Sequence, residues 1–138
     1  MTLLLDTSAI IGWFERKNPN TVERVSADRA TPMCHAVTFG ELADGWQRAV
    51  AAGAAPEMVE RRRFTFETVR DQFEVVCDLD PAAYAEVSLL ARRALSHNDL
   101  WIAAAARTHS TTLLTEDADL AALDGLVVVG ESLHVVRV

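Results

Sequence analysis

The sequence predicts an α/β fold, a three-layer sandwich in which a central, mostly parallel sheet of four to five strands carries helices on both faces. Three observations lead to this prediction. Short, continuously apolar runs, typical of buried parallel strands, alternate along the chain with longer segments of helical periodicity. The 138 residues are enough for one core. No internal repeat, linker or low-complexity tract interrupts them, so residues 1–138 are expected to form a single domain.

The strands are predicted from their apolar runs, at residues 2–5, 33–36, 73–77, 111–114 and 126–129. The tail, residues 134–138, is expected to add an edge strand. The first run stops at Asp6 and the fourth ends at Thr115, so polar residues stand at the carboxyl ends of both strands.

The intervening segments are predicted to be helices, at about residues 9–14, 22–29, 39–52, 56–70, 81–95, 99–109 and 117–123. Thr7 or Ser8 is expected to cap the first helix and Thr38 the third, because short hydroxyl side chains satisfy free backbone N–H groups. Gly53 is expected to end the third helix, and Pro81 to stand in the first turn of the fifth.

The charge of the chain bears on its partners. The net charge of −7, taken alone, argues against a nucleic-acid ligand, because phosphate contacts need Lys or Arg. An acidic pocket is partly neutralised when it holds divalent metal ions, so the overall balance is weak evidence. The runs Arg61–Arg63 and Arg92–Arg93 can contact phosphates, although such runs are more often solvated helix faces.

The cysteines and the apolar segments indicate a cytoplasmic protein. Cys34 and Cys77 lack the spacing of a zinc site and are expected to be buried free thiols in a reducing compartment. No apolar stretch is long enough to span a bilayer. The N-terminus has no basic start and reaches Asp6 too early for a signal peptide. We therefore expect no contact with a membrane.

Four acids are predicted to meet at one edge of the sheet. Asp6 closes the first strand and Asp117 follows the fourth, and ligands of open α/β sheets bind beyond the carboxyl ends of the strands. Glu41 is expected in the first turn of the helix after the second strand, and Asp99 at the start of its own helix. Each acid alone can be explained as a cap or as a partner of the helix dipole. Their coincidence favours a shared pocket.

Such a pocket suits the hydrolysis of phosphodiesters. Clustered carboxylates repel one another, which raises the pKa of some of them. A hard divalent cation such as Mg²⁺ relieves this repulsion and prefers oxygen ligands. The cation can activate a bound water and polarise a phosphate, so no nucleophilic side chain is needed.

Four segments carry a family resemblance. They read Leu-Leu-Leu-Asp-Thr-Ser-Ala-Ile-Ile at 3–11, Thr-Phe-Gly-Glu-Leu-Ala-Asp-Gly at 38–45, Asn-Asp-Leu-Trp-Ile-Ala-Ala-Ala-Ala at 98–106 and Leu-Leu-Thr-Glu-Asp-Ala-Asp-Leu at 113–120. In this order and spacing the chain resembles the PIN-domain ribonucleases over nearly its full length. Its small size resembles the VapC toxin half of VapBC-type toxin–antitoxin pairs.

The resemblance implies a metal-dependent endoribonuclease that uses Mg²⁺, or Mn²⁺, and leaves a 5′-phosphate and a 3′-hydroxyl. It implies that the catalytic and metal-binding residues are Asp6, Glu41, Asp99 and Asp117. It also implies supporting roles for Thr7, Ser8, Asn98, Thr115 and Asp119. Glu116 stands where the family often has Asn or Asp, and Leu120 where it often has Phe. The fourth ligand therefore stays open between Asp117 and Asp119.

The resemblance further implies partners. These are a cellular RNA substrate (tRNA, rRNA or mRNA), a small VapB-like antitoxin, and a second copy of the chain in a homodimer that enters a larger complex with the antitoxin. Trp13, Phe14 and Trp46 are expected in the core, with a groove for an amphipathic antitoxin helix as the alternative.

Two other functions remain open: an RNA-processing nuclease of the same fold without an antitoxin, and a non-catalytic RNA- or protein-binding module. A phospho-acceptor receiver domain is disfavoured, because Lys17 is the only lysine and is in the wrong place.

Overall fold

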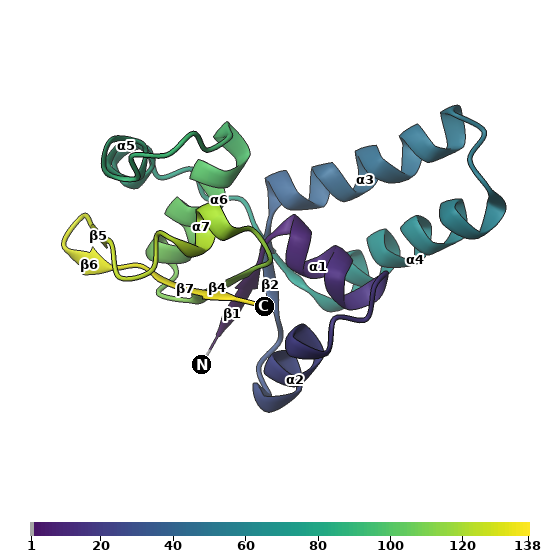
Figure 1. The fold of residues 1–138 in the computed structure, drawn as a ribbon, viewed down its shortest axis with the longest axis horizontal. Helices are drawn as coiled ribbons and strands as arrows, with labels where there is room; N and C mark the ends of the chain where they lie inside the picture. Colours follow the sequence, from purple (N-terminus) through teal and green to yellow (C-terminus); the bar gives the residue numbers. More distant parts are fainter. Residues whose placement is uncertain (1) are drawn as a thin grey trace.

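The computed structural model describes residues 2–138 and has a central sheet of five parallel strands (Figure 1). The order across the sheet is β3-β2-β1-β4-β7, and all four neighbouring pairs are parallel. The strands are β1 (Leu3–Leu5), β2 (Met33–His35), β3 (Glu74–Val76), β4 (Thr112–Thr115) and β7 (His134–Arg137). The predicted α/β fold is confirmed.

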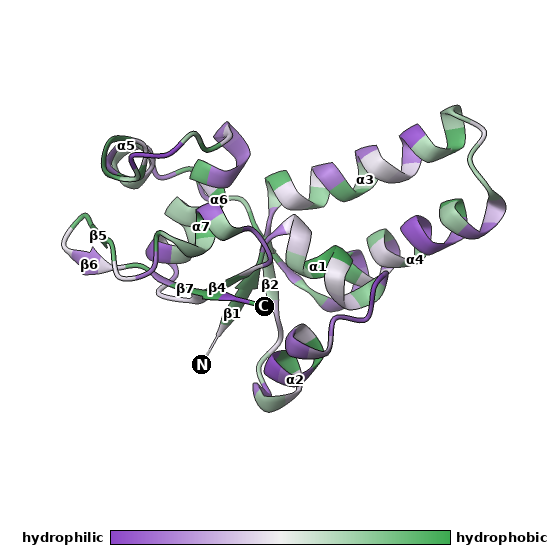
Figure 2. Cartoon of the chain, viewed as in Figure 1, coloured by the Kyte–Doolittle hydropathy of each residue, from purple (hydrophilic) through white to green (hydrophobic). Residues whose placement is uncertain are grey.

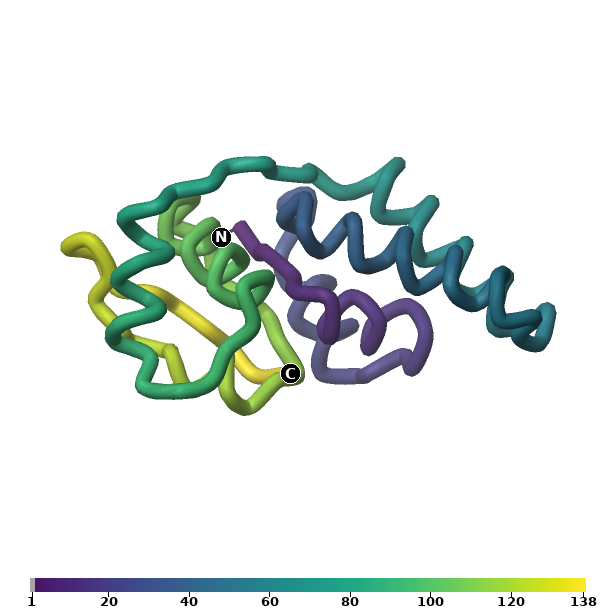
Figure 3. The backbone as a smooth tube through the Cα atoms, turned by 90° about the horizontal axis from the view of Figure 1, so that it is seen from above, coloured from purple at the N-terminus to yellow at the C-terminus, as the bar shows by residue number. Residues whose placement is uncertain are grey.

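Helices cover both faces of this sheet. They are α1 (Thr7–Phe14), α2 (Pro19–Ala27), α3 (Ala36–Ala51), α4 (Pro56–Gln72), α5 (Pro81–Leu90), α6 (His97–Thr108) and α7 (Ala118–Ala121). Figure 1 places α1 to α4 on one side and α5 to α7 on the other. Figure 3 shows α3 and α4 side by side in a hairpin that extends away from the sheet.

The alternation of side chains along β1 divides the core into two clusters. Leu4 packs with the apolar faces of α5 and α6, whereas Leu3 and Leu5 pack with those of α1, α3 and α4. Successive residues of a strand point to opposite faces, so a strand buried on both sides is apolar throughout. Hydropathic colouring shows apolar strands inside and helices of mixed polarity outside (Figure 2).

Two helix caps differ from the predicted ones. Asp6, and neither Thr7 nor Ser8, caps α1 by accepting a hydrogen bond from the Ala9 backbone N–H. His35, and not Thr38, caps α3. In both places the helix begins directly after a strand, so the last residue before the helix is the one positioned to cap it.

The start of α3 also changes the position of Glu41. Because α3 begins at Ala36, Glu41 lies in its second turn, and the expectation of a first-turn acid was wrong. The end of the helix was predicted correctly, since Gly53 follows it with a φ of 64°.

The fifth helix is shorter than predicted. It ends at Leu90, and Arg92 takes a left-handed φ of 53° that stops the helix. Leu90, the last residue of this helix, is exposed. The strand predicted at residues 126–129 forms outside the main sheet. The pair β5 (Val127–Val128) and β6 (Glu131–Ser132) forms a separate antiparallel hairpin, because Val129 and Gly130 both have positive φ in the turn between them.

The tail forms the edge strand of the sheet, as expected, because β7 pairs with β4.

Cys34 is buried as expected, but Cys77 is exposed just after β3, so the prediction of two buried thiols was half wrong. In residues 2–138, no helix combines the length and apolarity needed to cross a membrane.

Candidate active site at the carboxyl edge of the sheet

The strand order locates a crevice between β1 and β4. The chain moves from β1 to β2 and β3 on one side and then to β4 and β7 on the other, so the connections leave in opposite directions at this point. Ligands of open α/β sheets bind in such a crevice. Asp6 directly follows β1, and Asp117 lies two residues after β4.

Asp6 is buried and held by three donors. One carboxylate oxygen accepts from the Ala9 N–H and the Ser8 hydroxyl, both at 2.8 Å, and the other accepts from the Thr115 hydroxyl at 2.5 Å. Burial raises the pKa of Asp6, the three hydrogen bonds partly lower it, and the charge of Asp99 raises it again. Asp6 is therefore held in one orientation, and the negative charge of Asp99 lies near it.

Thr115 and Ser8 join the two loops that bear Asp6 and Asp117. The Thr115 hydroxyl accepts from the Asp117 N–H at 2.9 Å, and the Ser8 hydroxyl accepts from the Glu116 N–H at 2.9 Å. The Ser8–Glu116 bond, like the bond from the Thr115 hydroxyl to Asp6, connects residues more than a hundred positions apart. The spacing between Asp6 and Asp117 is thus set by two hydroxyl groups.

Glu41 comes to the crevice from α3 and is exposed. The Thr7 hydroxyl donates to its carboxylate at 3.0 Å. Upstream, the buried ring of His35 accepts from the Val37 N–H at 3.1 Å and bonds the Asp78 carbonyl at 2.8 Å. Sequence reasoning missed His35 as the residue that fixes the start of α3, since no local pattern distinguishes a capping histidine.

Asp99 is the third residue of α6 and is half-buried. Its backbone N–H donates to the Ser96 hydroxyl at 3.1 Å, which caps the helix. Burial raises the pKa of Asp99, hydrogen bonds with Ser96 lower it in part, and the negative charge of Asp117 raises it.

Asp117 and Asp119 differ in position. Asp117 caps α7, accepts from the Asp119 N–H at 2.8 Å and lines the crevice. Asp119 is exposed, and its carboxylate pairs with Arg93 at 3.1 Å. Neither Asp119 nor Asn98 is among the described residues that line this hollow.

The four acids line one hollow of about 360 Å³. The residues around it are Asp6, Thr7, Ser8, Ile11, Arg16, Glu41, Asp99 and Asp117. Arg16 also binds the carboxylate of Glu116, which lies against Gly12. The walls thus bring four carboxylates and one guanidinium to the same space.

The donor set suits a hard divalent cation, because carboxylate oxygens are what Mg²⁺ and Mn²⁺ prefer. Within residues 2–138, however, no three His, Cys, Asp or Glu side chains are close enough together to hold an ion by themselves. Mg²⁺ commonly binds one or two carboxylates and keeps several waters, so an ion here would take waters as its remaining ligands.

The arginines of the run Arg61–Arg63 differ in their surroundings. Arg63 pairs with Glu60 and Glu67 on α4, as on a solvated helix face. Arg62 instead turns inward and donates to the Gly45 carbonyl at 2.9 Å. The prediction for this run was therefore too coarse, because neighbouring arginines have different environments.

Comparison with known proteins places the chain in a family. Residues 3–126 match the PIN domain. The chain belongs to the PIN domain family. Ribonuclease VapC5 of Mycobacterium tuberculosis is 33% identical to it over 139 residues, which cover 98% of this chain and 94% of that protein.

Solved structures share the PIN fold over the whole chain. VapBC-5 of M. tuberculosis, from the VapBC family of toxin–antitoxin systems, has a TM-score of 0.68 at 29% identity, covering 99% of this chain and 98% of that one. VapBC2 of Rickettsia felis, bound to a promoter DNA fragment, has a TM-score of 0.72 at 16% identity and covers 100% and 99% of the two chains. The second likeness concerns the fold alone.

Proposed function

We propose that this PIN protein is a Mg²⁺- or Mn²⁺-dependent endoribonuclease and the toxin of a toxin–antitoxin pair. Asp6, Glu41, Asp99 and Asp117 are its catalytic and metal-binding residues. One observation carries the proposal: four carboxylates from separate elements line one hollow at the β1–β4 crevice. The 33% identity to a protein named a ribonuclease supports the reaction class.

A bound divalent cation would supply an activated water and stabilise the charge on the phosphate. The chain's own part is to hold the ligands. Asp6 is oriented by three hydrogen bonds, so it presents its carboxylate without needing to reorganise. Asp99 and Asp117 repel each other, which favours the arrival of a cation between them.

Arg16 provides the positive charge that an anionic substrate needs at this acidic hollow. Among the described residues that line the hollow, Arg16 has the one positively charged side chain. Its guanidinium can bind a phosphate through two N–H donors. Glu116 holds Arg16 at the rim in the structure. We propose that Arg16 exchanges Glu116 for an RNA phosphate near the cleaved bond.

An antitoxin is proposed as the second partner. VapBC-5, which is 29% identical to this chain, is a toxin–antitoxin system. An apolar groove of about 630 Å³ lies between α1, α2 and α4, and Phe64 is exposed within it. We propose that an amphipathic antitoxin helix lies against Trp13, Phe14 and Phe64. Trp46 packs on Phe66 instead and is not part of that groove.

We further propose that residues 1–138 act as one domain in the cytoplasm, where RNA is available, and form homodimers that assemble with the antitoxin. Relief of growth arrest by a co-expressed antitoxin would support the toxin role. A chain that cuts RNA but arrests no growth would instead be an RNA-processing nuclease.

The decisive experiment is cleavage of single-stranded RNA, tRNA and rRNA by purified protein, with Mg²⁺ or Mn²⁺ titrated in. We expect metal-dependent cleavage that leaves 5′-phosphates. Asp117→Asn should abolish it, whereas Asp119→Asn, a matched change two residues away, should retain most of it. No cleavage with either metal would favour the binding module, and 2′,3′-cyclic ends would rule out attack by water.

A further inference from the structure

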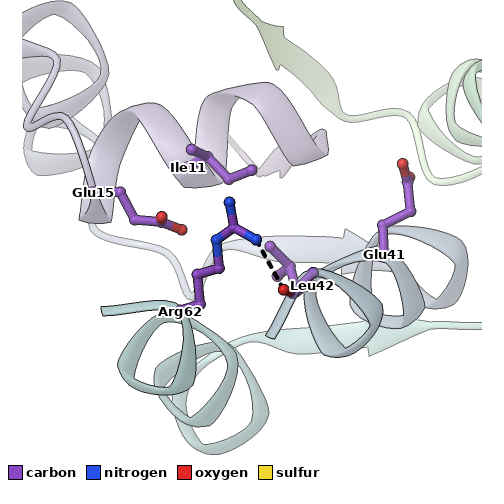
Figure 4. A pocket seen from close by; sticks show the side chains of 6 residues that line it. Ile11, Glu15, Glu41, Leu42 and Arg62 are labelled. Carbon is purple, nitrogen blue, oxygen red and sulfur yellow. Dashed lines mark hydrogen bonds between the residues drawn. The ribbon is translucent and has the colours of Figure 1, made fainter. Parts of the chain in front are cut away.

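A second hollow borders the acidic one, between α1, α3 and α4. It has a volume of about 220 Å³, far more than a single water needs. Its walls are Ile11, Glu15, Glu41, Leu42, Gly45 and Arg62 (Figure 4). Ile11 and Glu41 also line the acidic hollow, so a chain bound there can extend directly into the second one.

Two opposite charges face this space from different helices. Figure 4 shows the Arg62 side chain reaching from α4 toward α1, with Glu15 directed toward its guanidinium. Arg62 is half-buried, and the Gly45 carbonyl uses one of its five N–H donors. The Thr65 hydroxyl has one proton, which it shares between the Arg61 carbonyl at 3.0 Å and the Glu15 carboxylate at 3.2 Å. Both groups keep further hydrogen-bonding capacity.

The other walls suit a flat, apolar ring. Ile11 and Leu42 contribute aliphatic surface from α1 and α3. Gly45 contributes no side chain, and a Cβ added there would meet nothing within 4 Å. The hollow is therefore open at Gly45, where a larger side chain would occupy part of it.

We propose that this hollow binds a guanine base next to the cleaved bond of the RNA, and this rests on the ribonuclease function proposed above. Guanine carries two neighbouring N–H donors, at N1 and N2, that match the carboxylate of Glu15. It carries acceptors at O6 and N7 that match the guanidinium of Arg62. Bases of single-stranded RNA are commonly read in this way, splayed out and bonded on their polar edges.

The pair of charges favours a base over a charged protein side chain. An arginine of a protein partner would pair with Glu15 but be repelled by Arg62. A carboxylate would pair with Arg62 but be repelled by Glu15. A neutral base with separate donor and acceptor edges satisfies both groups at once. The shared wall at Glu41 places such a base beside the carboxylates that would hold the metal.

The test is cleavage of a randomised single-stranded RNA library with Mg²⁺, followed by sequencing of the products. Wild type should enrich guanine at one position beside the cut by about tenfold or more. Gly45→Leu, which fills the hollow, and Arg62→Ala should remove this enrichment. Gly40→Leu and Arg61→Ala are the matched controls and should retain it, because Gly40 also has free space on α3 but neither residue lines the hollow.

Modified bases separate the two contacts. Inosine, which lacks the N2 amino group, should weaken recognition through Glu15, and 7-deazaguanine should weaken recognition through Arg62. An unchanged base preference in Gly45→Leu would overturn the proposal. So would variants that lose antitoxin binding alone, since the hollow would then belong to a protein partner.

Binding measurements keep this proposal separate from the ribonuclease function. RNA hexamers that differ only in one guanine or adenine can be titrated into the Asp99→Asn protein and followed by fluorescence anisotropy. A guanine preference that Gly45→Leu removes would support the subsite even if the wild type cut no RNA. Equal affinities in a protein that does cut RNA would overturn the subsite and leave the nuclease intact.

Discussion

The two walls of the acidic hollow are built in different ways. On the strand wall, Asp6 is buried, and Thr115 and Ser8 connect it to the loop that bears Asp117. On the helix wall, Glu41 is exposed on α3, and one hydrogen bond from Thr7 steadies its side chain. The strand wall is therefore rigid before any ligand binds, whereas the helix wall depends on where α3 lies. Changes to the strand wall should have the larger effects.

Apart from the loss of cleavage in Asp117→Asn, the largest effect is expected for Asp6→Asn. This change keeps an acceptor for the Ala9 N–H but removes the negative charge at the centre of the strand wall. Cleavage should fall by at least about 10²–10³-fold, as for the loss of other preorganised charge-stabilising groups. Metal-dependent cleavage assays measure the fall, and circular dichroism checks that the fold is retained. Activity within tenfold of wild type would show that Asp6 has only a capping role.

Thr115→Val should have the next largest effect. It removes the hydroxyl that donates to Asp6 and accepts from the Asp117 N–H, so it leaves two polar groups without that partner. We expect a loss of about 1–3 kcal/mol in unfolding free energy and a 10–100-fold loss of activity.

The matched control for Thr115→Val is Thr111→Val, just before the other end of the same strand, where the hydroxyl makes a long 3.4 Å bond to Ala106. Urea unfolding and cleavage assays compare the two. If both changes reduced activity equally, the special role of the Thr115 hydroxyl would be refuted.

The pH dependence of stability should sharpen the comparison further. The pKa values of Asp6 and Asp99 are raised in the folded protein, so the unfolded chain loses its protons first as pH rises. Without metal, stability should therefore fall as pH rises from the ordinary aspartate value of about 3.9 through the raised values.

Asp99→Asn should lose part of this pH dependence and melt at a higher temperature than metal-free wild type at neutral pH. Mg²⁺ should raise the melting temperature of wild type more than that of the variant. Thermal unfolding at several pH values tests both statements. A variant that melts below wild type at neutral pH would contradict the repulsion between Asp99 and Asp117.

The smallest effect is expected for Thr7→Val on the helix wall. The Thr7 hydroxyl bonds Glu41 near the surface, where water can replace it. Stability should change by less than about 0.5 kcal/mol. Activity should fall several-fold, well below the loss in Thr115→Val. If the two losses were equal, the two walls would be equally important in positioning the carboxylates.

Sequence patterns located much of this site because strand ends are local features. A short apolar run that stops at Asp6, and another that ends at Thr115, place their next residues at one edge of a parallel sheet wherever the helices lie. The arrival of Glu41 and Asp99 at the same hollow agrees with the expected convergence. Their catalytic and metal-binding roles remain a proposal.

Other features were not predictable from local patterns. The apolar run that contains β5 resembles any buried strand in sequence, and only its pairing with β6 distinguishes it from a member of the main sheet. The same holds for Cys77, whose exposure depends on what packs near the end of β3. The periodicity of apolar residues predicts that a segment is a strand, but it does not predict which sheet or neighbouring strand that segment pairs with.

The sequence by itself determined the α/β order, the PIN resemblance and the four acids at the carboxyl edge, because these follow from short-range patterns and spacing. Tertiary structure decided which acid of the pair Asp117 and Asp119 lines the hollow, which residues cap α1 and α3, and that Arg62 turns inward while Arg63 stays on the surface. The physical reason is distance along the chain. The Thr115 hydroxyl meets Asp6 across 109 positions, and a hydrogen bond of that span exists only after the sheet has formed.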